Sequence, residues 1–190
     1  PNGDTMLHLP RVGACLLALC ATLLSACATA DKPAVAATSL AKAATTQGAI
    51  WSNVPTQVLS AGGVDFAYRE LGQKDAGTPV ILLTHLAAVL DNWDPRVVDG
   101  IAVKHHVIAF DNRGVGASSG SPANTIEQMA DDAITFIKAK GFKQVDLFGF
   151  SMGGMVAQEI VLKEPQLVRK LILTGTGPAG GPGISTVARV

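Results

Sequence analysis

Apolar residues follow two different periods along the chain, and both patterns begin only after about residue 50. Short apolar runs, which are typical of buried strands, alternate with segments in which apolar residues recur every three or four positions, as on one face of a helix. The expected strands are 56–60, 64–70, 79–84, 106–110, 145–148 and 171–174. The expected helices are 92–104, 125–140 and 152–163.

The order of these segments predicts the fold class. Gly62 and Gly63 separate the first two strands, and a two-glycine link of this kind is typical of an antiparallel hairpin. Strands and helices then alternate, which favours a parallel sheet with right-handed crossovers. The sequence therefore predicts an α/β domain whose mostly parallel sheet begins with an antiparallel hairpin.

The amino-terminal segment has the pattern of an export signal. Arg11 precedes an apolar run over 12–24, which is shorter than the roughly 20 apolar residues that span a bilayer. The run closes with Leu-Ser-Ala-Cys, ending at Cys27, and this resembles the lipobox of bacterial lipoproteins. The resemblance implies a lipoprotein signal peptide at 1–26, cleavage before Cys27, and lipidation of that residue. An ordinary signal peptide that happens to precede a cysteine is the alternative.

A lipid anchor at Cys27 would fix the location of the protein. Several acyl chains on one residue bind a membrane stably, whereas a single chain binds reversibly. Ala28 stands in place of the acidic residue of inner-membrane lipoproteins, so the resemblance implies export to the periplasmic face of the bacterial outer membrane. The next residues are rich in Ala, Thr and Lys without a bulky apolar period, which predicts a flexible tether over 27–50.

Composition excludes two classes of function. The chain has 15 basic and 15 acidic residues and no basic block, so we expect no nucleic-acid binding. Its three cysteines lie within the first 27 residues, which leaves no thiolate site in the folded region. The four histidines include no pair at the i, i+4 spacing that places two ligands on one helical face, so we expect no metal ion.

The segment 149–153, Gly-Phe-Ser-Met-Gly, lies between an expected buried strand and an expected helix and matches G-x-S-x-G. In this context the motif makes a sharp turn that holds a nucleophilic serine, here Ser151, in a strained conformation. We expect the flanking glycines to be required because a Cβ would collide with the neighbouring strand and helix. A chance Gly/Ser turn is the alternative, and the flanking strand and helix disfavour it.

With this motif the sequence resembles the α/β-hydrolase fold superfamily, and most closely its serine-dependent, cofactor-free haloperoxidase and esterase branch. The resemblance covers about 56–177. Three further motifs agree with it: Thr-His at 84–85, Asn-Trp at 92–93, and Asp-Asn-Arg-Gly-Val-Gly-Ala-Ser at 111–118. The resemblance implies an enzyme that acts on small-molecule esters or related acyl compounds through an acyl-enzyme, without a metal or organic cofactor.

The same resemblance assigns roles to residues. It implies that Ser151 is the nucleophile and that the backbone N–H of Met152 is one oxyanion donor. The second donor should be the amide of Leu86 or Ala87, and the choice stays open because Leu86 replaces the glycine of the family pattern. His85 is expected to stabilise this loop, because the catalytic base of the family follows the nucleophile in the chain.

Four other polar residues receive structural roles. The resemblance implies that Asp111 and Arg113 hold the loop after the fourth strand. His105 and His106 precede a strand at the opposite end of the sheet, and we expect them to be surface or packing residues.

The sequence lacks the partners that a serine nucleophile needs. A triad requires an acid and then a histidine after the serine, but no Asp or His follows Ser151, and the only acids there are Glu159 and Glu164. The strand expected over 171–174 would also remain a bare apolar edge. We therefore expect 51–190 to be the first part of an α/β-hydrolase domain, without its cap and last strands, and this fragment alone to be inactive.

Other interpretations remain to be weighed. The segment 175–180 spells G-x-G-x-x-G, but Pro178 opposes the helix that a dinucleotide site requires. Serine at position 151 argues against dehalogenases and epoxide hydrolases, which need a carboxylate there. Esterase, lactonase, C–C bond hydrolase and perhydrolase activities stay open. The rival class is a non-catalytic lipoprotein that uses the fold to bind a small molecule or a partner.

Overall fold

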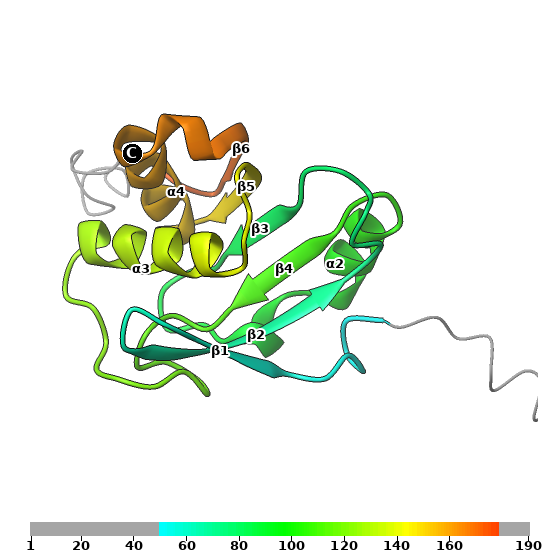
Figure 1. Cartoon of the computed structure of the whole chain (residues 1–190), viewed down its shortest axis with the longest axis horizontal. Helices are drawn as coiled ribbons and strands as arrows, with labels where there is room; N and C mark the ends of the chain where they lie inside the picture. The colour runs from blue at the N-terminus through cyan, green and yellow to red at the C-terminus, as the bar shows by residue number, and fades with distance from the viewer. Residues whose placement is uncertain (1–49, 179–190) are drawn as a thin grey trace, which may run out of the picture. The chain divides into compact units, whose positions relative to one another are not determined.

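One six-stranded sheet organises residues 50–178, which are the residues that the computed structural model describes (Figure 1). The predicted signal peptide, Cys27 and nearly all of the predicted tether lie outside these residues. The strands are β1 (Gln57–Ala61), β2 (Val64–Leu71), β3 (Val80–Leu83), β4 (Val107–Phe110), β5 (Val145–Phe150) and β6 (Val168–Thr174). The helices are α2 (Pro95–Ala102), α3 (Ile126–Ala139) and α4 (Met152–Lys163), with short 3₁₀ turns η1 (Leu90–Asn92) and η2 (Pro165–Leu167).

The sheet order is β1-β2-β4-β3-β5-β6. β1 and β2 form an antiparallel hairpin, and β2 also pairs antiparallel with β4. The remaining pairs, β4 with β3, β3 with β5, and β5 with β6, are parallel. The predicted α/β class, with a mostly parallel sheet and an antiparallel amino-terminal hairpin, is confirmed.

The hairpin turn is built as its two glycines predict. Ala61 pairs with Val64, so Gly62 and Gly63 form a two-residue loop. Their φ angles are 57° and 78°, the left-handed values that a type I′ turn needs at both central positions. Glycine adopts these angles without a steric penalty, which explains why the sequence has two of them here.

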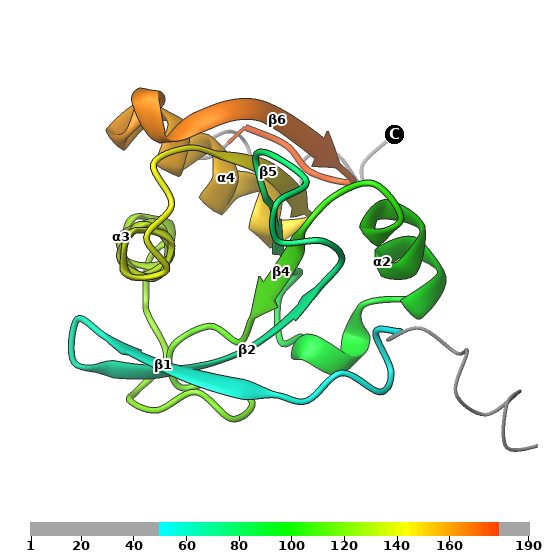
Figure 2. The same ribbon diagram turned by 45° about the vertical axis from the view of Figure 1, so that its right-hand side comes forward.

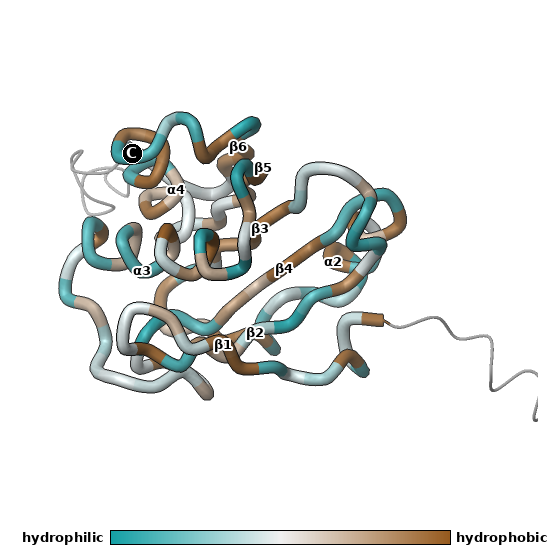
Figure 3. Tube along the Cα trace, viewed as in Figure 1, coloured by the Kyte–Doolittle hydropathy of each residue, from teal (hydrophilic) through white to brown (hydrophobic). Residues whose placement is uncertain are grey.

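Helices cover both faces of the sheet (Figure 2). Successive side chains of a strand point to opposite faces, so Ile81 and Leu83 of β3 join the core under α3 and α4, whereas Val80 and Leu82 join the core under α2. Both faces are therefore apolar, and Figure 3 shows β3 and β4 as hydrophobic along their length. This explains why these strands are continuous apolar runs in the sequence.

Two predicted boundaries are wrong for identifiable reasons. The helix expected over 92–104 begins only at Pro95, where Asp94 caps it by accepting a hydrogen bond from the Arg96 N–H at 2.9 Å. Proline suits the first turn of a helix because its missing N–H would have no partner there. The last strand begins at Val168 rather than at 171, because Arg169 pairs with Asp146 of β5 and extends the sheet through a charged segment.

β6 forms one edge of the sheet and leaves large apolar side chains in solvent. Leu171, Ile172 and Leu173 are all exposed, and β5 is the neighbour of β6 within the described residues.

Of the helices between residues 50 and 178, none combines the length and the apolar character needed to cross a bilayer.

Candidate active site

Ser151 is the single residue between the end of β5 at Phe150 and the start of α4 at Met152. Its φ and ψ are 53° and −119°, a region that residues with side chains rarely adopt. Three hydrogen bonds hold it: its N–H donates to the Thr174 carbonyl at 3.0 Å, and its carbonyl accepts from the Gly154 N–H at 2.9 Å and the Thr176 hydroxyl at 2.6 Å. The sequence thus folds here into a strained strand-to-helix turn.

The glycines around Ser151 are required by close backbone contacts. A Cβ on Gly149 would lie 2.6 Å from the carbonyl oxygen of Gly153 and from the Cα of Gly154. A Cβ on Gly153 would overlap the carbonyl of Leu83, the last residue of β3. The prediction that side chains at these positions would collide with the neighbouring strand and helix is confirmed.

Met152 is the first residue of α4, so its N–H has no acceptor within the helix. Among the described residues no other oxygen accepts a hydrogen bond from it. The N-terminus of a helix also carries partial positive charge, which favours an anion. The Met152 N–H is therefore available to a developing oxyanion beside Ser151.

The loop that should supply the second donor spans 84–89 and joins β3 to η1; we call it the oxyanion loop. The Ala88 N–H donates to the His85 carbonyl at 3.4 Å and closes a turn. Ala87, the third residue of this turn, has a φ of 57°. The sequence draws attention to Leu86 as the residue that replaces a glycine, but the left-handed position is Ala87. Leu86 instead exposes 70% of its surface.

His85 contacts its own loop and β5, the strand that leads into the strained turn at 149–153, which we call the elbow. Its Nδ1 lies 2.9 Å from the carbonyl oxygen of Leu86, and its ring packs edge-on against Phe150 with 5.5 Å between ring centres. These contacts agree with the expectation that His85 stabilises the loop.

Asp111 and Arg113 occupy the loop after β4, as expected, and each has a defined partner. Arg113 donates to Asp132 of α3. Asp111 accepts from the Ala117 N–H within its own loop at 3.0 Å. It also accepts from the Leu90 N–H at 2.8 Å, at the end of the oxyanion loop, and this contact is not predicted by the sequence motif.

A second group of ionisable residues lies at the opposite end of the sheet, before β4, and is built around Glu70. We call Glu70, Lys74, His106 and Lys140 the Glu70 cluster. Lys74, His106 and Lys140 all contact the Glu70 carboxylate, at 2.7, 3.1 and 3.1 Å. Burial acts to raise the pKa of Glu70, but the hydrogen bonds and charges of the two lysines outweigh it and lower the pKa to about 2.

Histidines 105 and 106 both lie away from the elbow, as expected. Burial lowers the pKa of His106, although its hydrogen bond to Glu70 opposes the shift, so the neutral form is favoured. His106 is a buried packing residue with its ring edge against Phe142, and His105 is half-buried. Between residues 50 and 178, no three His, Cys, Asp or Glu side chains are arranged to hold a metal ion.

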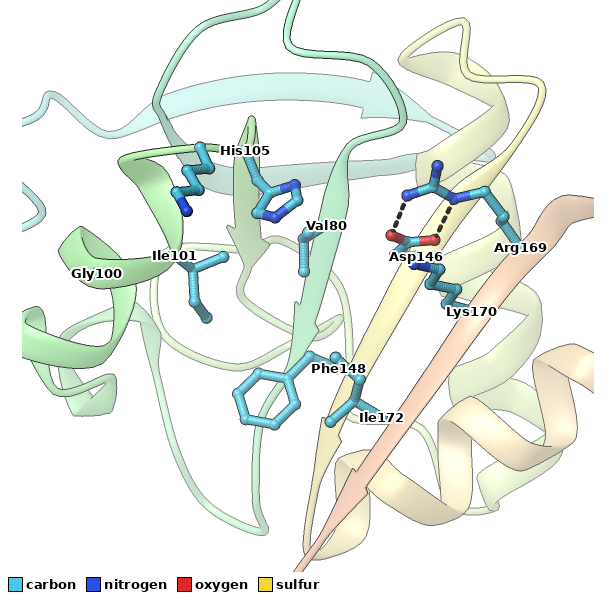
Figure 4. A pocket seen from close by; sticks show the side chains of 10 residues that line it. Val80, Gly100, Ile101, His105, Asp146, Phe148, Arg169, Lys170 and Ile172 are labelled. Carbon is cyan, nitrogen blue, oxygen red and sulfur yellow. Dashed lines mark hydrogen bonds and ion pairs between the residues drawn. The ribbon is translucent and has the colours of Figure 1, made fainter.

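Two cavities differ in their distance from the elbow. One of about 220 Å³ is lined by Thr84 and His85 of the oxyanion loop, by Phe150 of β5 and by Thr174, the hydrogen-bond partner of Ser151. A larger one of about 490 Å³ lies between α2 and the strands β5 and β6, beside the Asp146–Arg169 ion pair (Figure 4). Neither this larger cavity nor a third one of about 230 Å³ beside Asp111 is lined by elbow residues, so the cavity at Phe150 and Thr174 is the candidate substrate site.

Comparison with known protein families shows to which family the chain belongs. Residues 78–187 match the family model of the alpha/beta hydrolase fold. The chain belongs to this family. The matched region of the chain includes the oxyanion loop, the loop after β4 and the elbow.

Individual relatives support the assignment. The chain is 30% identical over 114 residues to a Mycobacterium tuberculosis protein named as a non-heme bromoperoxidase, BpoC, covering 60% of this chain and 42% of the relative. It is 33% identical over 128 residues to the proline iminopeptidase PfmaB of Pestalotiopsis fici, covering 65% and 44%. An alpha/beta hydrolase fold protein from Chitinophaga pinensis superposes with a TM-score of 0.64 at 38% identity, covering 66% and 45%. The chain spans less than half the length of each.

Proposed function

We propose that the protein containing these residues is a serine hydrolase that acts on ester-like or related acyl substrates, with Ser151 as its nucleophile. The backbone conformation of Ser151 carries the proposal, because it is strained and lies beside the Met152 N–H, which has no acceptor among the described residues. Such strain costs on the order of 1–3 kcal/mol and is concentrated at functional sites. The relatives named as a bromoperoxidase and an iminopeptidase are named as enzymes, which supports an enzymatic role.

The reaction would proceed through an acyl-enzyme. The Ser151 hydroxyl oxygen attacks the carbonyl carbon of the substrate while its proton passes to a histidine base. The carbonyl oxygen gains negative charge, which the Met152 N–H and the amide of Leu86 or Ala87 stabilise. The leaving group departs with the transferred proton. Water then attacks the acyl-serine by the same route and releases the acid.

We propose that the acid and the base of the triad are supplied by residues beyond Val190. No Asp or His follows Ser151 in the given sequence, and the chain covers less than half of the relatives it matches. The 190-residue chain alone would then be inactive toward esters. We call the longer protein, with its acid and histidine, the parent protein.

We further propose that the parent protein is exported and held by a lipid anchor at Cys27 on the periplasmic face of the bacterial outer membrane. The Leu-Ser-Ala-Cys run supports this. Cys27→Ala should move the parent protein from the membrane fraction to the soluble fraction. Retention of this variant in the membrane fraction would contradict an anchor at Cys27.

A non-catalytic lipoprotein that binds a small molecule or a partner is the second candidate. The cavity of about 220 Å³ beside Phe150 and Thr174 would serve such binding without catalysis. The strained serine opposes it, because a binding protein has no use for that strain.

A fluorophosphonate probe separates the two candidates. We expect the probe to label the wild-type parent protein and not its Ser151→Ala variant, because phosphonylation needs the serine hydroxyl. Ser52→Ala is the matched control, since Ser52 is exposed and far from the elbow in the chain, and it should label fully. Equal labelling of Ser151→Ala and wild type would refute the nucleophile, and a folded but unlabelled wild type would favour the binding protein.

A further inference from the structure

We propose that Asp111 is a positioning residue that holds the oxyanion loop in place through η1. The proposal rests on the proposed function, because it concerns how that site is held. It assigns Asp111 a role in the reaction beyond fixing its own loop.

The carboxylate of Asp111 bridges two segments. One oxygen, Oδ1, accepts from the Leu90 N–H at 2.8 Å, and the other, Oδ2, accepts from the Ala117 N–H at 3.0 Å. Leu90 is the first residue of η1 and directly follows the oxyanion loop. One buried side chain, only 3% exposed, thus ties the end of the oxyanion loop to the loop after β4.

The surroundings of this carboxylate leave it little freedom. A Cβ on Gly116 would overlap the carboxylate, so only glycine fits there. Among the described residues no side chain donates to the Asp111 carboxylate, and both of its hydrogen bonds come from backbone N–H groups. Hydrogen bonds to an ionised group are roughly twice as strong as neutral ones. The Asp111 charge therefore acts directly on the backbone of η1.

Other contacts hold η1 from different sides but do not reach the same amide. The Trp51 indole N–H donates to the Leu90 carbonyl at 3.3 Å. Arg69 of β2 pairs with Asp91 at 2.7 Å, and Asp91 is largely exposed. Asp111 is the partner of the Leu90 N–H, and that amide is the one nearest the oxyanion loop. Loss of this bond would therefore free the carboxyl-terminal end of the oxyanion loop, which contains the candidate donors Leu86 and Ala87.

The effect of the Asp111–Leu90 bond can be separated from the general anchoring of the loop after β4, because a second carboxylate also holds that loop. Asp132 of α3 pairs with Arg113 of that loop and, among the described residues, makes no hydrogen bond or ion pair to η1. Asp111→Asn removes a buried charge within the loop after β4, and Asp132→Asn removes the buried α3 charge that holds Arg113 of the same loop. Only the first changes a bond to η1, which directly follows the oxyanion loop.

The test compares fluorophosphonate labelling of the wild-type, Asp111→Asn and Asp132→Asn parent proteins, resolving the maximal rate from the half-saturating concentration. Removing one oxyanion donor lowers turnover by about 10²–10³-fold, and we expect a partly displaced loop in Asp111→Asn to lower the maximal rate by about 10-fold with the half-saturating concentration nearly unchanged. Asp132→Asn should keep the wild-type rate, whatever its thermal stability.

A labelling rate for Asp111→Asn equal to that of Asp132→Asn would overturn this proposal while leaving the proposed function intact. A wild-type protein that does not label would overturn both. If Asp111→Asn does not fold, the labelling rate of Trp51→Phe tests the proposal, because this variant lacks the indole hydrogen bond to the same η1 residue, Leu90. A lowered maximal rate in Trp51→Phe supports control of the loop through η1, and an unchanged rate overturns it.

Discussion

The two ends of the central strands differ in strain and in how their polar groups are paired. At the carboxyl end, Ser151 and Ala87 are the two non-glycine residues of the described chain with positive φ, and the Met152 N–H there has no acceptor within residues 50–178. At the opposite end, the Glu70 cluster pairs every charge it buries. Strain and an unpaired donor mark the end suited to chemistry, whereas paired charges mark the end that stabilises the fold.

The largest effect should come from adding one methyl group at the elbow. Gly153→Ala places a Cβ against the Leu83 carbonyl, and backbone cannot move aside cheaply, so we expect a loss of about 3 kcal/mol in the free energy of unfolding. Gly100→Ala in α2 is the matched control, because a Cβ there meets open space and alanine favours helix by about 0.5–1 kcal/mol. Urea unfolding of both variants measures this. Equal stability of the two variants would contradict the close approach.

A smaller effect is expected from the opposite end of the sheet. Glu70→Gln leaves Lys140 and His106 without their carboxylate, and we expect a loss of about 2 kcal/mol in the free energy of unfolding, since breaking a buried ion pair costs several kcal/mol and Lys74 is exposed. Fluorophosphonate labelling of the folded variant should match the wild type. Reduced labelling at full folding would break the division of roles between the two ends.

The same cluster predicts a pH dependence of stability. The pKa of Glu70 falls from 4.5 to about 2 on folding, and the pKa of His106 is lowered as well. In both cases the unfolded chain binds more protons in acid, so protonation favours unfolding. Stability should fall as pH drops below the ordinary histidine pKa of about 6.5, and again between 4.5 and about 2.

Urea midpoints at pH 7, 5 and 3 would measure this dependence. The Glu70→Gln variant should lose less stability than wild type between pH 5 and pH 3, because it lacks the carboxylate that titrates there. If the urea midpoints of the two proteins fall equally between pH 5 and pH 3, Glu70 is not the titrating group.

The smallest effect concerns strain in the oxyanion loop. Ala87→Gly removes the Cβ penalty of a left-handed residue, about 1–2 kcal/mol, and adds the entropy of glycine to the unfolded chain, so we expect a net gain of about 0.5 kcal/mol. Leu86→Gly is the control, because Leu86 has no positive φ and glycine there should destabilise by about 0.5–1 kcal/mol. If urea unfolding shows instead that Leu86→Gly is stabilised and Ala87→Gly is destabilised, the strain lies at Leu86.

The sequence predicts elements best where several local signals coincide. The span of α4 matches its prediction because the elbow begins it and Glu164 followed by Pro165 ends it. The start of α2 is missed because the apolar pattern runs back across Asn92, whereas the cap and the proline set the actual boundary at Pro95. Local patterns therefore give the order of elements and leave their ends to capping and pairing.

The candidate site divides in the same way. Ser151 and its glycines are visible in the sequence because the turn is made by consecutive residues. The bond from Leu90 to Asp111 joins residues 21 positions apart and depends on how β3 and β4 lie side by side, so no local pattern indicates it. The positive φ of Ala87 likewise follows from closing the loop between β3 and η1.

Mass-spectrometric localisation of the fluorophosphonate adduct on the wild-type parent protein tests the central claim most directly. The difference between the two ends of the sheet predicts one adduct, on the peptide that contains Ser151. An adduct on another serine, or a folded protein with no adduct, would contradict the claim that the strained end of the sheet carries the nucleophile.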